Sequence, residues 1–175
     1  MIRVVVTGPE CTGKTMLAEA LAARYETVWV PEYARRFVRA KAAAPSYEDV
    51  ETIARGQIAL EEKHVPQASR VLIQDTDLLS TVVYSRHYYG DCPDWIEEAL
   101  ERRAADLYLL AGIDIPWVAD GPYRDRGDRR EEMHGLFRSA LLARELDFAE
   151  IRGSHDERLT TAGSAIDSLM IRHSV

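Results

Sequence analysis

Short apolar runs alternate with longer amphipathic segments along this chain. Runs rich in β-branched and other apolar residues predict five strands, at positions 2–7, 27–30, 71–74, 106–111 and 148–151. Between these runs, apolar residues recur every three or four positions, which predicts helices. Strands that alternate with helices form βαβ units with right-handed crossovers. We therefore expect an α/β fold with a five-stranded parallel sheet and helices on both of its faces.

Polar residues mark the predicted helix starts. Ser46 with Asp49, and Ser154 with Glu157, match the capping box, in which two side chains bond to free N–H groups at the start of a helix. Asp94 is expected to cap a further, shorter helix.

The helix expected after position 46 carries polar groups on its buried face. Its apolar stripe consists of Val50, Ile53, Ala54 and Ile58. Gln57 and Glu61 fall on the same stripe. Buried polar groups need partners, so two interpretations stay open: these side chains line a pocket, or the stripe turns toward the surface there.

The first predicted strand runs directly into a glycine-rich segment. Positions 8–15 are Gly-Pro-Glu-Cys-Thr-Gly-Lys-Thr, which fits G-x-x-x-x-G-K-[ST], the phosphate-binding P-loop. Its glycines let the backbone wrap closely, and the N–H groups of the loop and of the next helix converge on an anion. We expect ATP to be bound by Gly8, Glu10, Cys11, Thr12, Gly13, Lys14, Thr15 and Met16. The alternative is a glycine-rich turn with an unrelated lysine.

With this motif, the expected architecture becomes the three-layer sandwich of a P-loop NTPase. Lys14 would reach the β- and γ-phosphates, and the hydroxyl of Thr15 would bind Mg²⁺. Asp75 ends an apolar strand, as a Walker B acid does, so we expect it to hold Mg²⁺ through a water. Asp77 is the alternative acid, or it caps the following helix.

Parallel sheets gather their binding groups at the carboxyl ends of the strands. Glu32 lies at such an end, where a kinase needs a carboxylate to orient or deprotonate the acceptor hydroxyl. The alternative is a first-turn glutamate that the helix dipole stabilises. Arg35, one helical turn further on, would contact a phosphate or pair with Glu32.

The segment at about 120–130 is rich in arginine and glycine. Its arginines are Arg124, Arg126, Arg129 and Arg130. Arginines that close over a transferring phosphoryl group neutralise its charge and exclude water, so we expect a lid here. Because Asp125 and Asp128 are interleaved, a solvated charged loop is the alternative. Just before this segment, Trp117 either stacks on a flat ring or packs in the core.

Composition limits the possible partners. With 175 residues, one domain over 1–175 is expected, and the net charge of −7 argues against a general nucleic-acid binder. Because no apolar run approaches about 18 residues, we expect no membrane span. The only cysteines are Cys11 and Cys92, so a structural disulfide is improbable and a reducing cytoplasm fits. The oligomeric state stays open.

Taken together, these motifs resemble the NadR-type ribosylnicotinamide kinase domain, a family of small P-loop kinases. The resemblance covers nearly the whole chain and is carried by the P-loop and by the motifs at 31–35, 75–77 and 117–121. It implies that the first and third strands are neighbours. It also implies ATP and Mg²⁺ as cosubstrates, and nicotinamide riboside phosphorylated at its 5′-hydroxyl in NAD synthesis. A kinase for another nucleoside or small alcohol, or a P-loop NTPase switch that is not a kinase, is the alternative.

The motifs and the resemblance together give the expected site residues. The expected catalytic set is Lys14, Glu32, Asp75, Arg124 and Arg126, and the expected substrate-binding set is Glu32, Tyr33, Arg35, Gln57, Asp77, Trp117 and Asp120. Two departures concern the acceptor side. Pro31 stands where some members have a stacking aromatic, and the stretch from Asp120 to Arg124 has one residue more than the family's Asp-Gly-x-Arg pattern.

Overall fold

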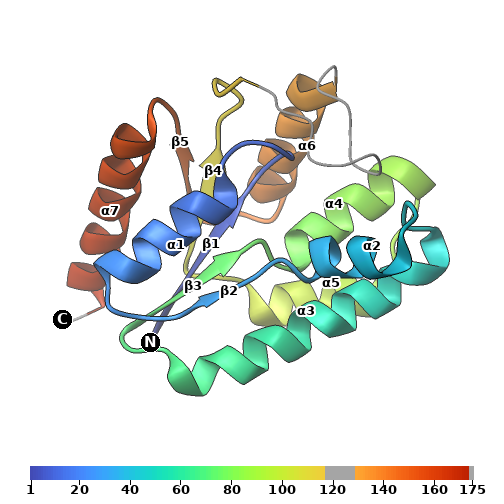
Figure 1. Ribbon diagram of the computed structural model, residues 1–175, viewed down its shortest axis with the longest axis horizontal. Coiled ribbons are helices and arrows are strands. Elements are labelled where there is room, and N and C mark those ends of the chain that lie inside the picture. The colour runs from blue at the N-terminus through green and yellow to red at the C-terminus, as the bar shows by residue number, and fades with distance from the viewer. Residues whose placement is uncertain (117–128, 174–175) are drawn as a thin grey trace.

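A single parallel sheet forms the centre of the protein. The computed structural model describes residues 1–116 and 129–173. In this part of the chain, the sheet has the strand order β2-β3-β1-β4-β5 (Figure 1). The strands are β1 Ile2–Thr7, β2 Trp29–Val30, β3 Val71–Asp75, β4 Leu107–Ala111 and β5 Phe148–Ile151. All four strand pairs are parallel, so the predicted sheet is confirmed, as is the contact between its first and third strands.

Strand β1 lies in the middle of the sheet, between β3 and β4. Its register with β3 runs from Ile2 opposite Val71 to Val6 opposite Asp75. The carboxyl end of β3 therefore lies beside the point where β1 enters the P-loop, and Asp75 is brought next to that loop.

Helices cover both faces of the sheet, and Figure 1 shows α1 and α7 together on one side. The helices are α1 Lys14–Arg24, α2 Tyr33–Lys41, α3 Val50–His64, α4 Leu78–Tyr89, α5 Asp94–Arg103, α6 Arg130–Ala143 and α7 His155–Arg172. Two 3₁₀ turns, η1 Tyr47–Asp49 and η2 Val65–Gln67, flank α3. In the described ranges, none of the helices has the length and apolar character needed to span a membrane.

Side-chain alternation along the strands divides the core into two layers. Val5 of β1 packs in a cluster with residues of α3, α4, α5 and α6, whereas Val4 and Val6 pack in a second cluster with α1 and α7. Strand β4 alternates in the same way. Successive side chains of a strand point to opposite faces, so a strand covered on both faces is apolar at nearly every position.

Both predicted capping boxes are present. Ser46 N donates to the Asp49 carboxylate at 2.8 Å before η1, and Ser154 N donates to the Glu157 carboxylate at 2.7 Å at the start of α7. The prediction for Asp94 is wrong. Asp94 is the first residue of α5, and Pro93 occupies the cap position without a side-chain bond. The Asp94 carboxylate lies in the first turn, where the helix dipole favours a negative charge.

Candidate nucleotide site and acceptor cavity

The P-loop glycines are required by the surrounding fold as well as by a ligand. Gly8 has φ 127°, and a Cβ atom there would lie 3.1 Å from the carbonyl oxygen of Ala111 in β4. Gly13 has φ 77° and precedes the first residue of α1. Side chains rarely adopt these conformations, so the loop depends on glycine at both positions.

The side chain of Lys14 folds back onto the loop. Its Nζ donates to the carbonyl oxygen of Pro9 at 2.7 Å, and Thr12 Oγ1 donates to the same oxygen at 2.8 Å. Lys14 is buried. The ammonium group is therefore held beside the loop backbone, where the loop would present its N–H groups to phosphates.

Thr15 and Asp75 meet at the end of β3. Thr15 Oγ1 donates to Asp75 Oδ2 at 2.5 Å. Asp75 Oδ1 is buried and has no hydrogen-bond partner among the residues that the structure describes. Burial raises the pKa of Asp75, Lys14 opposes that effect, and Glu32 adds to it.

This pair fits a Mg²⁺ ion. The Thr15 hydroxyl and the buried Asp75 carboxylate, whose Oδ1 is unused, provide hard oxygen donors, which Mg²⁺ prefers. Over residues 1–116 and 129–173, no cluster of three or more His, Cys, Asp or Glu side chains could hold a metal. The donor set therefore suits an ion whose remaining ligands are water and phosphate oxygens.

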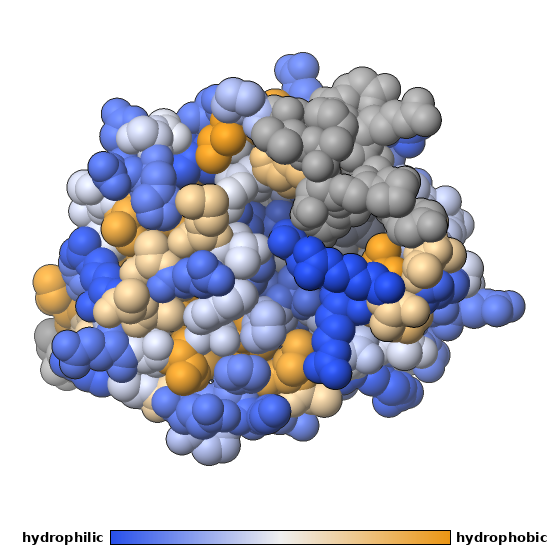
Figure 2. All heavy atoms as spheres, in the orientation of Figure 1, coloured by the Kyte–Doolittle hydropathy of each residue, from blue (hydrophilic) through white to orange (hydrophobic). Residues whose placement is uncertain are grey.

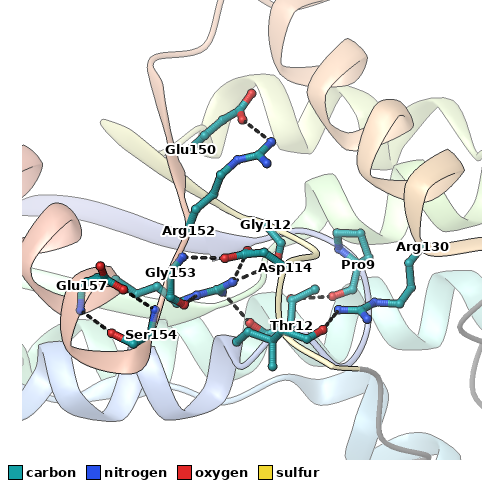
Figure 3. A network of polar contacts seen from close by, with 12 residues as sticks. Pro9, Thr12, Gly112, Asp114, Arg130, Glu150, Arg152, Gly153, Ser154 and Glu157 are labelled. Atoms are coloured by element: carbon teal, nitrogen blue, oxygen red, sulfur yellow. Dashed lines mark hydrogen bonds and ion pairs between the residues drawn. The ribbon is translucent and has the colours of Figure 1, made fainter.

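Arg158 of α7 holds the other side of the P-loop. Its guanidinium donates to the carbonyl oxygens of Thr12 at 2.9 Å, Gly112 at 3.2 Å and Gly153 at 2.9 Å, and to Asp114 Oδ1 at 2.6 Å. Figure 3 shows these groups converging from three loops. Arg158 was not among the residues predicted from the sequence. The available signal was a charged residue four positions before Ala162 on the buried stripe of α7.

Arg130 approaches the same loop from the start of α6. It donates to the carbonyl oxygens of Cys11 at 3.3 Å and Ile115 at 2.9 Å. The neighbouring Arg129 lines the acceptor cavity defined below. The remaining candidates of this region, Trp117, Asp120, Arg124 and Arg126, lie outside the described residues, as does most of the expected lid.

A cavity of about 710 Å³ lies next to the P-loop, and we call it the acceptor cavity. It is enclosed mainly by α2, α3 and α4, with Glu10 from the P-loop and Thr76 from the end of β3. Figure 2 shows strongly hydrophilic side chains across the centre of this face, over the region where Figure 1 places α2. A cavity of this volume suits a small molecule.

Three of the predicted substrate-binding residues line this cavity from α2 and α3. Glu32 directly precedes α2, and Arg35 Nε donates to its carboxylate at 3.4 Å. Gln57 is buried, accepts from Tyr33 N at 2.8 Å and donates to the carbonyl oxygen of Pro31 at 3.4 Å. Gln57 therefore fixes the backbone on which Glu32 is carried.

The stripe of α3 stays buried at its polar positions, so the surface alternative is wrong. Gln57 lines the acceptor cavity, whereas Glu61 pairs with Arg3 at 3.1 Å and with Arg103 at 3.2 Å. The pocket interpretation therefore fits Gln57 but not Glu61, because Glu61 is not among the lining residues and two arginines balance its charge.

Asp77 lines the acceptor cavity and also caps α4. Its Oδ1 accepts from Leu79 N at 3.0 Å, and its Oδ2 accepts from the Tyr108 hydroxyl at 2.8 Å. Burial raises the pKa of Asp77 to about 6, against the opposing effect of these two bonds. Since both oxygens are occupied, the structure favours the capping alternative.

The tyrosines of the site are not those that sequence analysis selected. The ring of Tyr33 lies against Gly56 of α3, where an added Cβ would come within 2.2 Å of it, and Tyr33 is not among the lining residues. Tyr84, Tyr88 and Tyr89 of α4 line the cavity instead. The sequence feature that could have identified them is their helical spacing: Tyr84 and Tyr88 lie one turn apart on the helix that follows Asp77.

Met16 contributes little to this arrangement through its side chain. The residue is 62% exposed, although sequence analysis placed it among the nucleotide ligands. Its side chain is not part of the buried core, so contact with a nucleotide would fall to its backbone N–H.

A family model described as an AAA domain matches residues 3–158. The chain belongs to this family. It is 27% identical over 174 residues to the trifunctional NAD biosynthesis/regulator protein NadR of Escherichia coli K12, and 26% identical to NadR of Salmonella typhimurium. Each match covers 95% of this chain but only 42% of the relative, so the chain spans less than half the length of these relatives.

Solved structures share the fold. A NadR protein in complex with NR matches with a TM-score of 0.79 at 24% identity, covering 96% of this chain and 50% of that one. NadR in complex with NAD and AMP-PNP matches at 0.78 and 22%, covering 99% of this chain and 50% of that one. Thymidylate kinase from Candida albicans matches at 0.67 and 12%, covering 97% and 92%. This AAA domain therefore shares its fold with the NadR structures and with a thymidylate kinase.

Proposed function

We propose that this chain is an ATP- and Mg²⁺-dependent kinase that phosphorylates nicotinamide riboside to nicotinamide mononucleotide. The observation that carries the proposal is the acceptor cavity, which opens beside the P-loop and has Glu32 on its lining. The NadR relatives, whose names include NAD biosynthesis, support this acceptor over others. The relatives are more than twice as long as this chain, so their activities as whole proteins do not transfer to it directly. The acceptor is therefore part of the proposal.

On the nucleotide side, the loop N–H groups and Lys14 hold the β- and γ-phosphates. Thr15 Oγ1 and, through a water, Asp75 would hold Mg²⁺, which neutralises charge on those phosphates. The Thr15–Asp75 hydrogen bond of 2.5 Å supports this assignment, since both groups already face one point.

On the acceptor side, Glu32 takes the proton from the 5′-hydroxyl of the riboside. The hydroxyl oxygen then bonds to the γ-phosphorus, and the bond to the bridging oxygen breaks and releases ADP. The Arg35 bond at 3.4 Å orients the Glu32 carboxylate. Arg124 and Arg126 would neutralise the negative charge of the transferring phosphoryl group.

The tyrosines of α4 suit an acceptor with a flat ring. The rings of Tyr84 and Tyr88 lie nearly parallel, with an interplanar angle of 7°, and Tyr89 extends the same lining. An aromatic surface binds a planar base by stacking. These side chains would supply the stacking surface that some NadR-type members have next to Glu32, where this chain has Pro31.

The test is ADP release from ATP and Mg²⁺, measured without acceptor and with a panel of nucleosides that includes nicotinamide riboside. We expect slow release alone and strong stimulation by nicotinamide riboside. Stimulation by another nucleoside would keep the kinase and replace its acceptor. Fast release with no acceptor would identify an NTPase switch and refute the kinase.

A further inference from the structure

Two consecutive carbonyl groups of the P-loop are held from outside by arginines. Arg130 donates to the carbonyl oxygen of Cys11 at 3.3 Å, and Arg158 donates to that of Thr12 at 2.9 Å. The two arginines come from α6 and α7, far away in the sequence, and Figure 3 shows Arg130 beside Thr12.

A trans peptide group is planar, with its C=O and N–H pointing in opposite directions. A bond that fixes the carbonyl of Cys11 therefore also fixes the N–H of Thr12, and a bond to the carbonyl of Thr12 fixes the N–H of Gly13. These N–H groups belong to the loop that a P-loop protein turns toward phosphates.

We propose that Arg158, assisted by Arg130, is a positioning residue that presets the Thr12 and Gly13 N–H groups of the P-loop for phosphate. Arg158 does not touch the phosphates in this role. The inference rests on phosphate binding by the P-loop and is independent of which acceptor the chain uses.

The surroundings of Arg158 suit a rigid support. The residue is 3% exposed, and it holds carbonyl oxygens of the loops after β4 and β5 in addition to Thr12. Asp114 orients the guanidinium at 2.6 Å and itself accepts from Gly153 N at 2.6 Å. Charge-assisted bonds of this kind are short and directional, so they define a single position for the loop.

The test uses Mg²⁺-tripolyphosphate, which contains the phosphate chain of ATP without base, sugar or acceptor. Calorimetry would compare its Kd for the wild type, Arg158→Met and Arg158→Lys. We expect Kd to rise by about tenfold or more in Arg158→Met and by a smaller factor in Arg158→Lys, which keeps the charge but not the fork of donors. Asp114→Asn should also weaken binding while leaving the P-loop sequence intact, so the test survives if Arg158→Met fails to fold.

Arg103→Met is the matched control, since Arg103 also pairs with an acidic side chain, that of Glu61, but belongs to the carboxyl end of α5. Its Kd for tripolyphosphate should equal that of the wild type even if its stability falls. As a second readout, ¹H–¹⁵N spectra should show the Thr12 and Gly13 amide signals displaced in Arg158→Lys but not in Arg103→Met. An unchanged Kd in the Arg158 and Asp114 variants, an equal loss in Arg103→Met, or a wild type that does not bind tripolyphosphate would each overturn the inference.

Discussion

The P-loop and the acceptor cavity adjoin at Glu10 and Thr76, but different chemical groups form them. The P-loop is one continuous segment whose donors are mainly backbone N–H groups, fixed by glycine conformations and by bonds to its carbonyl oxygens. The acceptor cavity takes its lining mainly from side chains of three separate helices, α2, α3 and α4.

This difference explains why the two sides are not equally specific. A backbone nest recognises phosphate whatever nucleoside carries it, and few substitutions preserve it. A cavity lined by side chains can change its ligand by single substitutions while the helices stay in place. Substitutions on the two sides should therefore separate nucleotide binding, phosphoryl transfer and acceptor choice.

The largest effect is expected on the nucleotide side, from Lys14→Met. Removing one preorganised donor at a developing negative charge lowers kcat by about 10² to 10³-fold. Steady-state ADP release at saturating acceptor would measure it, with the exposed Lys63→Met as the control for loss of a positive charge. Wild-type activity in Lys14→Met would contradict the assignment of the P-loop.

The second-largest loss of activity is expected from Glu32→Gln. Glu32 lines the acceptor cavity, which adjoins the P-loop. We expect a loss of about 10²-fold, the lower end of what a general base contributes, because the amide keeps the size of the side chain and its contact with Arg35. We expect kcat to fall with the Kd for ATP within about twofold of wild type. A normal kcat would restrict Glu32 to a structural role at the start of α2.

Asp77→Asn should change stability more than binding, although Asp77 lines the acceptor cavity. The pKa of Asp77 is raised from 3.8 to about 6, so the folded state holds this proton more tightly than the unfolded state. The resulting stabilisation is fully present below about pH 4 and is lost as pH rises through 6, by at most about 3 kcal/mol. Asparagine keeps the cap of α4, so we expect its unfolding free energy to depend less on pH than that of the wild type. Denaturant titrations at pH 4.5, 6 and 8 would test this, and identical pH profiles would contradict it.

The smallest effect is expected from Tyr88→Leu on the acceptor side. Aromatic contacts contribute about 0.5–1.5 kcal/mol, so KM for the acceptor should rise roughly three- to tenfold with little change in KM for ATP. Tyr47→Leu is the control, since Tyr47 has a similar exposure but lies outside the lining. If both variants raised KM for the acceptor equally, the effect would be on folding rather than stacking.

The difference between the P-loop and the acceptor cavity also determined which features could be predicted from the sequence. β1, β3 and β4 are apolar at most positions because both faces of the sheet are covered, so their positions were clear. The second strand is shorter than the predicted 27–30. Thr27 Oγ1 donates to the carbonyl oxygen of Val71 at 2.7 Å, and so Thr27 contacts β3 through its side chain ahead of β2. The P-loop could be predicted whole because its ligands are consecutive residues.

Contacts between distant segments could not be predicted. Arg158 meets Thr12 across 146 positions, and only the sheet order shows that α7 passes the P-loop. Tyr33 was predicted to bind the substrate because of its place in a motif. Its ring packs against α3 instead, in the space left by the missing side chain of Gly56. The α4 tyrosines reach the cavity because that helix packs against α3.

The most direct test of the proposed function is to identify the product formed from nicotinamide riboside. The wild-type protein would be incubated with ATP, Mg²⁺ and the riboside, and the mixture analysed by mass spectrometry and ³¹P NMR. The account predicts a riboside monophosphate, phosphorylated at the 5′-hydroxyl, in amounts equal to the ADP released. ADP and inorganic phosphate with the riboside unchanged would contradict it.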